Sequence, residues 1–168
     1  VKEDWDRFVK NSIGDEKLLK KLEEYLPKIF MATEWLYNQE ELRIKLKGSQ
    51  KNRIKVTYHD PCHARKVQGI FKEPRGLLSS CYDLIEMEDP NRCCGFGGVT
   101  MQTDKYDYSL NAGLPKAKMI EESGAEIVSA ECSACRIQLT NVIHQYGSSV
   151  KFAHPLELIA QSLKESHA

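Results

Sequence analysis

The sequence predicts an α/β fold, with an open, mainly parallel sheet of four to five strands, helices on both faces and a helical segment in front. After residue 53, short β-branched and aromatic runs alternate with helical periodicity, which is typical of a parallel sheet covered on both faces. Before residue 50 the apolar spacing is helical. We therefore divide the chain into a helical segment, 1–50, that packs on the core, and a sheet-containing domain, 51–168.

The first segment is expected to be helical from Asp4 to Lys47, with a break at Pro27. Asp15, which follows a glycine, is a plausible N-cap for the apolar repeat after it. A short strand is expected at 29–31, as a hint of a fifth strand, followed by a helix from Thr33 to about residue 46. The polar run 48–52 then reads as a linker.

The second segment is expected to hold four strands and four helices. The strands are 54–58, 84–87, 127–130 and 150–153, and the helices are 74–80, 104–123, 133–146 and one that opens at Pro155. Gly124 and Gly147 are expected to end the second and third helices, because glycine readily adopts the left-handed conformation found there. Pro115 is expected to kink or divide the second helix.

Composition narrows the class of protein. The 168 residues suit one domain, and 24 basic residues balance 24 acidic ones, so no nucleic-acid partner is indicated. No apolar run approaches the roughly 18 residues of a membrane span. The N-terminus resembles neither a signal nor a transit peptide, so we expect a cytoplasmic protein whose cysteines bind metal rather than form disulfides. It also lacks Met, which favours a fragment of a longer chain.

Five of the six cysteines form one pattern. Cys62 follows the first expected strand, the pair Cys93–Cys94 lies in the loop after the second, and Cys132 and Cys135 follow the third at the start of a helix. The carboxyl ends of parallel strands meet at one edge of a sheet, where sites form. We therefore expect the five thiols to meet there.

The residues around these thiols suit a metal centre. The helix N-terminus at Cys132 favours a thiolate through its dipole and free N–H groups. Gly95, Gly97 and Gly98 would let the backbone approach a cofactor closely and direct N–H groups at sulfur. These glycines do not form a dinucleotide loop, because the full G-x-G-x-x-G pattern is absent.

Three interpretations of the thiols remain open from the residues alone. They could be buried structural thiols. They could bind zinc, which takes four ligands, through Cys93, Cys94, Cys132 and Cys135. They could also bind an iron–sulfur cluster. An ordinary four-iron cluster needs four cysteines, so a fifth suggests an unusual cluster or a cysteine with its own redox task.

Three motifs together resemble a known family. They are His59-Asp60-Pro61-Cys62-His63, Cys93-Cys94-Gly95-Phe96-Gly97-Gly98 and Cys132-Ser133-Ala134-Cys135. The set is similar to the cysteine-rich CCG domain of heterodisulfide reductases and of the iron–sulfur subunits of glycolate oxidase, lactate utilisation, anaerobic glycerol-3-phosphate dehydrogenase and some fumarate or succinate oxidoreductases. The resemblance covers about 56–163.

The resemblance implies a non-cubane four-iron cluster with Cys62, Cys93, Cys94, Cys132 and Cys135 as ligands. It implies an oxidoreductase domain that reduces a disulfide or relays electrons to a thiol or quinone. Relatives usually carry two such domains, so this chain is expected to be the C-terminal one and not fully active alone. Its partners would be the remaining domains or subunits of an iron–sulfur flavoprotein complex, which could hold it at the inner face of the membrane. The alternative is a non-catalytic zinc-binding or scaffolding module.

Four other residues carry weaker predictions. Cys81 falls outside the pattern and is expected to be a plain, partly buried thiol. His59 and His63 either bond to backbone beside the Asp60-Pro61 turn or act catalytically, delivering a proton to a thiolate leaving group. His154 ends the fourth strand at the same edge.

Overall fold

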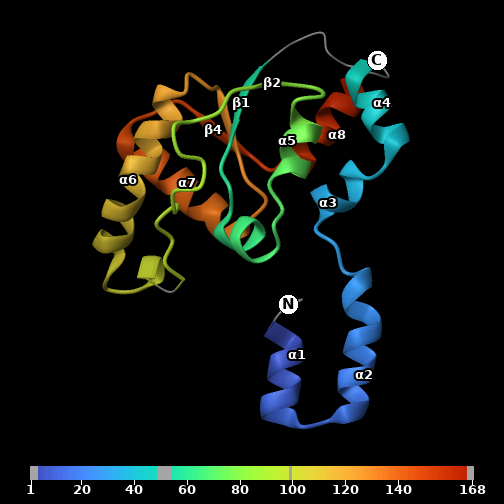
Figure 1. Cartoon of the computed structure of the whole chain (residues 1–168). Coiled ribbons are helices and arrows are strands. Elements are labelled where there is room, and N and C mark those ends of the chain that lie inside the picture. The colour runs from blue at the N-terminus through green and yellow to red at the C-terminus, as the bar shows by residue number, and fades with distance from the viewer. Residues whose placement is uncertain (1–3, 49–53, 99, 166–168) are drawn as a thin grey trace.

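The computed structural model describes residues 4–48, 54–98 and 100–165, and within them four strands form one parallel sheet (Figure 1). The strands are β1 (Lys55–Tyr58), β2 (Asp83–Leu84), β3 (Ile127–Ser129) and β4 (Lys151–Ala153). Their order is β2-β1-β3-β4, with Val56 opposite Ile127 and Val128 opposite Phe152. The predicted α/β class and the four expected strands are confirmed.

The described residues contain eight α-helices. They are α1 (Asp4–Phe8), α2 (Glu16–Tyr25), α3 (Ala32–Tyr37), α4 (Glu40–Gly48), α5 (Lys72–Leu78), α6 (Tyr106–Glu122), α7 (Ser133–Tyr146) and α8 (Pro155–Glu165). Short turns of other helix types lie between them: η1 (Val9–Ile13), η2 (Leu26–Lys28), η3 (His63–Val67) and η4 (Thr100–Gln102). Asp15 caps α2 as predicted, accepting hydrogen bonds from the N–H groups of Lys17 and Leu18.

Four details differ from the expectations. The helix expected from Thr33 to about residue 46 forms two helices, α3 and α4, and the strand expected at 84–87 is the shorter β2. No strand forms at 29–31, where Ile29 and Phe30 are exposed and follow the turn η2. The Ile29 N–H donates to the Leu26 carbonyl of that turn, and the Met31 N–H donates to the Glu34 side chain of α3, rather than to a strand. The helix α6 also runs through Pro115 undivided, so the expected division is wrong and a kink there stays a prediction. The cost of an internal proline, about 3 kcal/mol, is offset there by the burial of Ala117 and Ile120.

The sheet separates two apolar cores. Helices α6 and α7 cover one face, in a core formed by Met87, Cys94, Ala117, Ile120, Val128, Ala130, Cys135, Leu139, Val142 and Ile143. Helices α4, α5 and α8 cover the other, in a core formed by Leu46, Val56, Tyr58, Leu77, Leu78, Cys81, Tyr82, Leu158 and Ile159. Figure 1 shows the strands between these two groups of helices.

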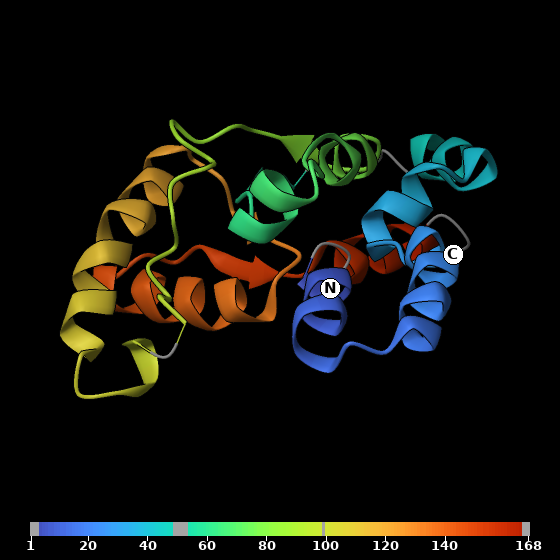
Figure 2. The same cartoon turned by 60° about the horizontal axis from the view of Figure 1, so that its bottom comes forward.

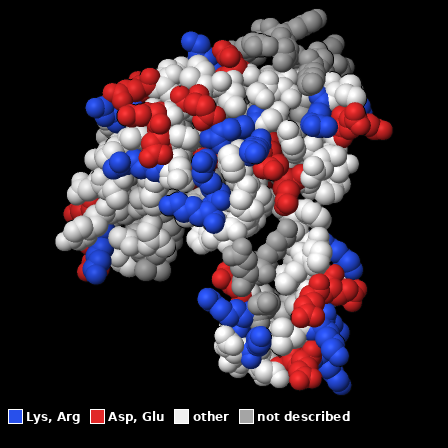
Figure 3. Space-filling view, in the orientation of Figure 1, with Lys and Arg blue, Asp and Glu red and all other residues white. Residues whose placement is uncertain are grey.

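The N-terminal helices divide into two parts. Helices α3 and α4 pack on α5 and α8, whereas α1 and α2 pair with each other in a hairpin, which we call the helical arm. The helical arm stands away from the sheet in Figure 1 and forms a separate lobe in Figure 3, and in Figure 2 it projects in front of α8. The linker expected at 48–52 falls almost wholly outside the described residues, so the domain boundary there stays a prediction.

Two surface features bear on partners. Among the described residues, none of the helices combines the length and the apolar character needed to cross a membrane. On the face seen in Figure 3, acidic and basic side chains are interspersed, in keeping with the zero net charge of the chain.

Candidate metal centre

The centre of the sheet is also the point at which its strand order reverses. The chain passes from β1 outward to β2, then returns to the opposite side of β1 for β3 and β4. Parallel sheets bind ligands outside the carboxyl ends of the strands at such a switch point. Here β1 leads into His59 and β3 leads into Cys132. The His59 N–H donates to the Ser129 carbonyl at 2.9 Å, which extends the β1–β3 ladder into the site.

A compact group of three buried side chains, His59, Cys94 and Cys135, lies at this point. Their ligand atoms all fall within 4.8 Å of one another, and the sulfurs of Cys94 and Cys135 are 3.6 Å apart. Two thiolates on one tetrahedral metal, each about 2.3 Å from it, lie about 3.8 Å apart. The Nδ1 atom of His59 is buried without a hydrogen-bond partner. The compact group therefore has the donors and the spacing that a bound metal needs.

Cys132 adjoins the compact group through Cys135. It is the N-cap of α7, and its pKa is lowered to about 5 by the hydrogen bond with the Cys135 thiol and by backbone N–H groups of Cys135 and Ala134. The hydrogen bond with Cys135, helped by His59, also lowers the pKa of Cys94 to about 4. The pKa of Cys135 is raised, because its proton is shared with two neighbouring sulfurs. The three thiols thus favour two thiolates, which are the form that binds metal.

The other two motif cysteines lie outside the compact group. Cys62 is exposed at the start of η3, with its sulfur 3.5 Å from Nδ1 of His63. Cys93 is also exposed, and its sulfur accepts a hydrogen bond from the Gly95 N–H at 3.4 Å. The structure therefore brings Cys94, Cys132 and Cys135 together with His59. A ligand role for all five cysteines stays a prediction.

The glycine loop is held by α6 rather than left open. Gly95 has a φ of 89°, and a Cβ atom there would lie 2.7 Å from the Gly113 nitrogen and 2.7 Å from the Ser109 carbonyl oxygen. Gly97 and Gly98 both have a φ of 62°, which favours glycine. These glycines let the chain bend tightly after Cys94, and a cofactor-binding role for them stays a prediction.

Three residues of α6, spaced four and three apart, hold this loop, and we call them the α6 stripe: Ser109, Gly113 and Lys116. The Ser109 hydroxyl donates to the Gly95 carbonyl at 2.6 Å, and the Lys116 ammonium donates to the Asp89 carbonyl at 2.6 Å. A Cβ atom on Gly113 would lie 2.7 Å from the Cys94 carbonyl. The α6 stripe was not predicted from the sequence, although small and polar residues on one helical face were its signal.

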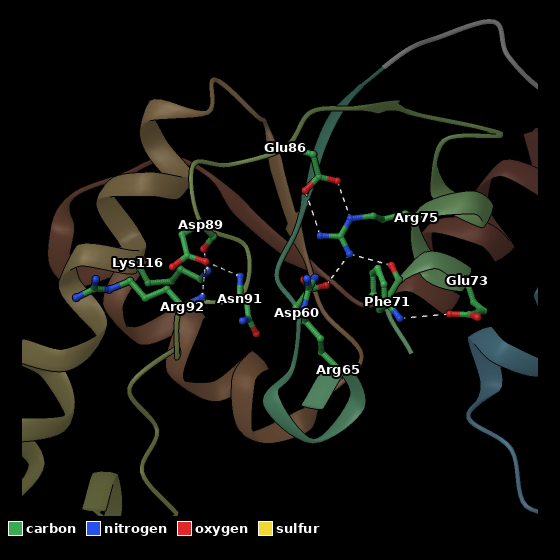
Figure 4. Close-up of polar contacts among 10 residues, drawn as sticks. All are labelled: Asp60, Arg65, Phe71, Glu73, Arg75, Glu86, Asp89, Asn91, Arg92 and Lys116. Atoms are coloured by element: carbon green, nitrogen blue, oxygen red, sulfur yellow. Dashed lines mark hydrogen bonds and ion pairs between the residues drawn. The ribbon is translucent and has the colours of Figure 1, made fainter. Parts of the chain in front are cut away.

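A buried ion pair supports the turn that precedes Cys62. The Asp60 carboxylate is fully buried and pairs with Arg65 and with Arg75, the latter at 2.6 Å (Figure 4). Arg75 also pairs with Glu86 at 2.6 Å. In addition, the Asp60 N–H donates to the Pro90 carbonyl at 2.9 Å, so the turn is tied to the loop that leads to the vicinal cysteines.

The N-terminal segment reaches the site through Thr33. This residue is fully buried at the start of α3, and both its N–H, at 3.1 Å, and its hydroxyl donate to the Glu131 carboxylate. Glu131 directly precedes Cys132. The position of the second cysteine pair is thus coupled to α3, a link that was not expected from the sequence.

Two residues with weaker predictions lie apart from the compact group. Cys81 is buried in the core against α5 and α8, where burial raises the pKa of its thiol to about 11. It is therefore a packing residue, as expected. His154 accepts a hydrogen bond from the Leu156 N–H at 3.2 Å and so caps the start of α8.

Comparison with known proteins points to one family. Residues 56–140 match the family described as a cysteine-rich domain, CCG. The chain is 35% identical over 109 residues to one subunit of a fumarate reductase (CoM/CoB) from Methanothermobacter marburgensis, which covers 63% of this chain and 22% of that protein. It is 39% identical over 95 residues to an uncharacterized iron–sulfur protein of Methanococcus maripaludis, covering 55% of this chain and 19% of that one.

A third relative extends further along the chain. It is one subunit of the dihydromethanophenazine:CoB–CoM heterodisulfide reductase from Methanosarcina barkeri, 31% identical over 124 residues, which cover 71% of this chain and 30% of the relative. The chain therefore spans less than a third of the length of each of these three relatives.

Proposed function

Because this chain belongs to the cysteine-rich domain family, we propose that it is an iron–sulfur redox domain of a heterodisulfide-reductase-like oxidoreductase. One observation carries the proposal: Cys94, Cys132 and Cys135 converge with His59 at the switch point of the sheet. The names of the relatives support it, since one is an iron–sulfur protein and another a heterodisulfide reductase subunit.

The proposed cofactor is a non-cubane four-iron cluster held by all five motif cysteines. The buried thiols of Cys94 and Cys135 and the half-buried Cys132 would form its inner side. Cys62 and Cys93, which are exposed, would close it from the solvent side. When bound, such a cluster supplies electrons one at a time.

The proposed reaction is reduction of a disulfide, or relay of electrons to a thiol or quinone acceptor. A disulfide needs two electrons and two protons to become two thiols. His63, whose Nδ1 lies 3.5 Å from the sulfur of the exposed Cys62, is proposed to deliver a proton there. His59 contacts Cys94 in the buried part of the site and is proposed to deliver a proton to the sulfur of Cys94.

The complete activity would need further parts of a larger complex. The relatives are roughly three to five times longer than the matched region, so electron delivery is proposed to come from other domains or subunits. We place the complex in the cytoplasm or at the inner face of a membrane through those partners.

Anaerobic reconstitution of the chain with ferrous iron and sulfide tests the proposal. We expect a brown protein with about four irons and four sulfides. Cys94→Ser and Cys135→Ser should lower bound iron and change the electron paramagnetic resonance spectrum, whereas Cys81→Ser, in the other core, serves as the matched control. A colourless protein that takes up no iron under these conditions would exclude the redox proposal.

A zinc module is the second candidate, and the compact group itself favours it. With Cys132, it offers three sulfurs and one imidazole, which is a common donor set for structural zinc. This set uses His59 in place of the Cys93 that the sequence suggested. One zinc per chain in protein grown with both metals, with no iron, would support this candidate.

A further inference from the structure

The chain buries a lysine that the proposed function does not use. Lys116 lies in the middle of α6, and its side chain has no exposed surface. Its ammonium donates to the Asp89 carbonyl at 2.6 Å, and among the described residues no carboxylate lies within ion-pair distance of it (Figure 4). A fully buried cation is therefore hydrogen-bonded to a neutral acceptor.

Such burial is costly unless negative charge lies nearby. The effective penalty for burying an ammonium is several kcal/mol, and a carbonyl hydrogen bond recovers only part of it. Burial is also the main reason that the pKa of Lys116 falls to about 8. A methionine would fill much of the same space without this penalty. Retaining a cation there is favourable only if the site holds an anion.

Three anionic groups act on Lys116, two carboxylates and one thiolate. Asp89, Asp60 and the Cys94 thiolate all attract its ammonium, while Arg92 opposes it. The carboxylate of Asp60 is already paired with Arg65 and Arg75. The Asp89 carboxylate is exposed and accepts hydrogen bonds from the N–H groups of Asn91 and Arg92. The Cys94 thiolate, by contrast, is buried and lies outside these pairs, with His59 as its contact.

The position of Lys116 fits this role. It is the third member of the α6 stripe, which holds Asp89 at one end of the cysteine loop and Gly95 at the other. Cys93 and Cys94 lie between these two points. The ammonium thus sits at the inner side of the loop that carries the vicinal pair.

We propose that Lys116 is the charge-compensating residue of the metal centre: its ammonium, bonded to the Asp89 carbonyl beside the vicinal cysteines, offsets the negative charge of the thiolates and of the cluster they bind. This inference rests on the proposed function. A positive charge beside a redox centre favours its reduced form, which carries one more electron. Lys116 should therefore raise the reduction potential of the bound centre.

The test compares three variants of the whole chain after anaerobic reconstitution. Lys116→Met removes the charge and keeps most of the volume, and Lys116→Arg keeps the charge. Lys118→Met is the matched control, since Lys118 lies on the same helix but is exposed and pairs with Glu122 at 3.6 Å. Iron content and a redox titration followed by electron paramagnetic resonance are measured for each protein.

We expect the control to match the wild type. Lys116→Met should bind as much iron as the wild type. At the wild-type midpoint potential, its ratio of reduced to oxidised centre should be about tenfold lower, which corresponds to a midpoint potential lower by about 59 mV for one electron. Lys116→Arg should restore most of that difference. A purely structural role would not shift the potential in this pattern.

Other outcomes separate this inference from the proposed function. If the wild type binds iron and Lys116→Met has the wild-type potential, the inference is wrong and the function stands. If the wild type binds no iron, both are wrong. Thermal unfolding of the metal-free chains adds an independent readout: Lys116→Met should unfold at or above the wild-type temperature, and a lower temperature or failure to fold would show a structural residue and overturn the inference.

Discussion

Replacing Gly113 with alanine gives a test in which two physical effects predict opposite signs. Helix propensity alone favours alanine over glycine in a helix interior by about 1 kcal/mol. The structure predicts the reverse, because the new methyl group would lie 2.6 Å from Val142 Cγ1, 2.7 Å from the Cys94 carbonyl oxygen and 2.9 Å from Gln138 Nε2. These neighbours enclose the position on three sides, and one of them is backbone.

The magnitude follows from overpacking. Inserting a methyl group into a filled core costs about 1–3 kcal/mol, and contacts this short place Gly113→Ala near the upper end. After the propensity gain, the net loss should be about 2 kcal/mol, or a fall in Tm of roughly 4–8 °C for a chain of this size. Because Cys94 must move, uptake of iron or zinc should weaken as well.

Circular dichroism with heating measures the first effect, and metal analysis after reconstitution measures the second. The control is Ala112→Gly, at the exposed neighbouring position on α6, which should lose about 1 kcal/mol by propensity and bind metal normally. A Gly113→Ala protein that is more stable than the wild type would refute the claim that α6 and the cysteine loop are in close contact.

Three further predictions concern the supports of the site. Asp60→Asn should cost about 3 kcal/mol in urea unfolding, because it leaves the largely buried Arg75 with one acid fewer; a loss below 1 kcal/mol would mean that the pair contributes little. Thr33→Val should lower stability by about 1–2 kcal/mol, since Glu131 loses a hydroxyl donor, and unchanged unfolding would count against this coupling. In metal-free protein, the pKa of Lys116 is about 8 in the folded state, below its ordinary 10.5, so unfolding takes up a proton between pH 8 and pH 10.5. The free energy of unfolding of the wild type, relative to that of Lys116→Met, should therefore rise with pH across this range and be constant below pH 8.

The elements that the sequence predicted correctly are those whose signals are local. Each strand is a short apolar run, and α2, α6 and α7 start or stop at residues such as Asp15, Gly124 and Gly147 that act within one turn. The edge at which Cys94, Cys132 and Cys135 meet also followed from the sequence, because parallel strands end on the same side. Cys62 and Cys93, which were expected to join them, are exposed outside this group.

The expectations that were wrong or incomplete depend on contacts between distant parts of the chain. A strand at 29–31 required a neighbouring strand that the fold does not supply, and local propensity cannot report this. The bond from Thr33 to Glu131 joins residues 98 positions apart. The burial of Lys116 depends on the loop at Asp89, whose carbonyl accepts from its ammonium, whereas an isolated lysine in a helix usually indicates a solvated face.

The hydrogen bond from His59 to Ser129 has a consequence for the dimensions of the site. This hydrogen bond continues the pairing of β1 with β3 into the site, so the two strand ends that carry His59 and lead to Cys132 are one strand spacing apart, about 4.8 Å in any sheet. The surrounding loops can lengthen or change composition without altering that width. Differences in these loops among related chains would then change which molecules can reach the thiols. The distance between β1 and β3, which sets the width of the metal site, would stay the same.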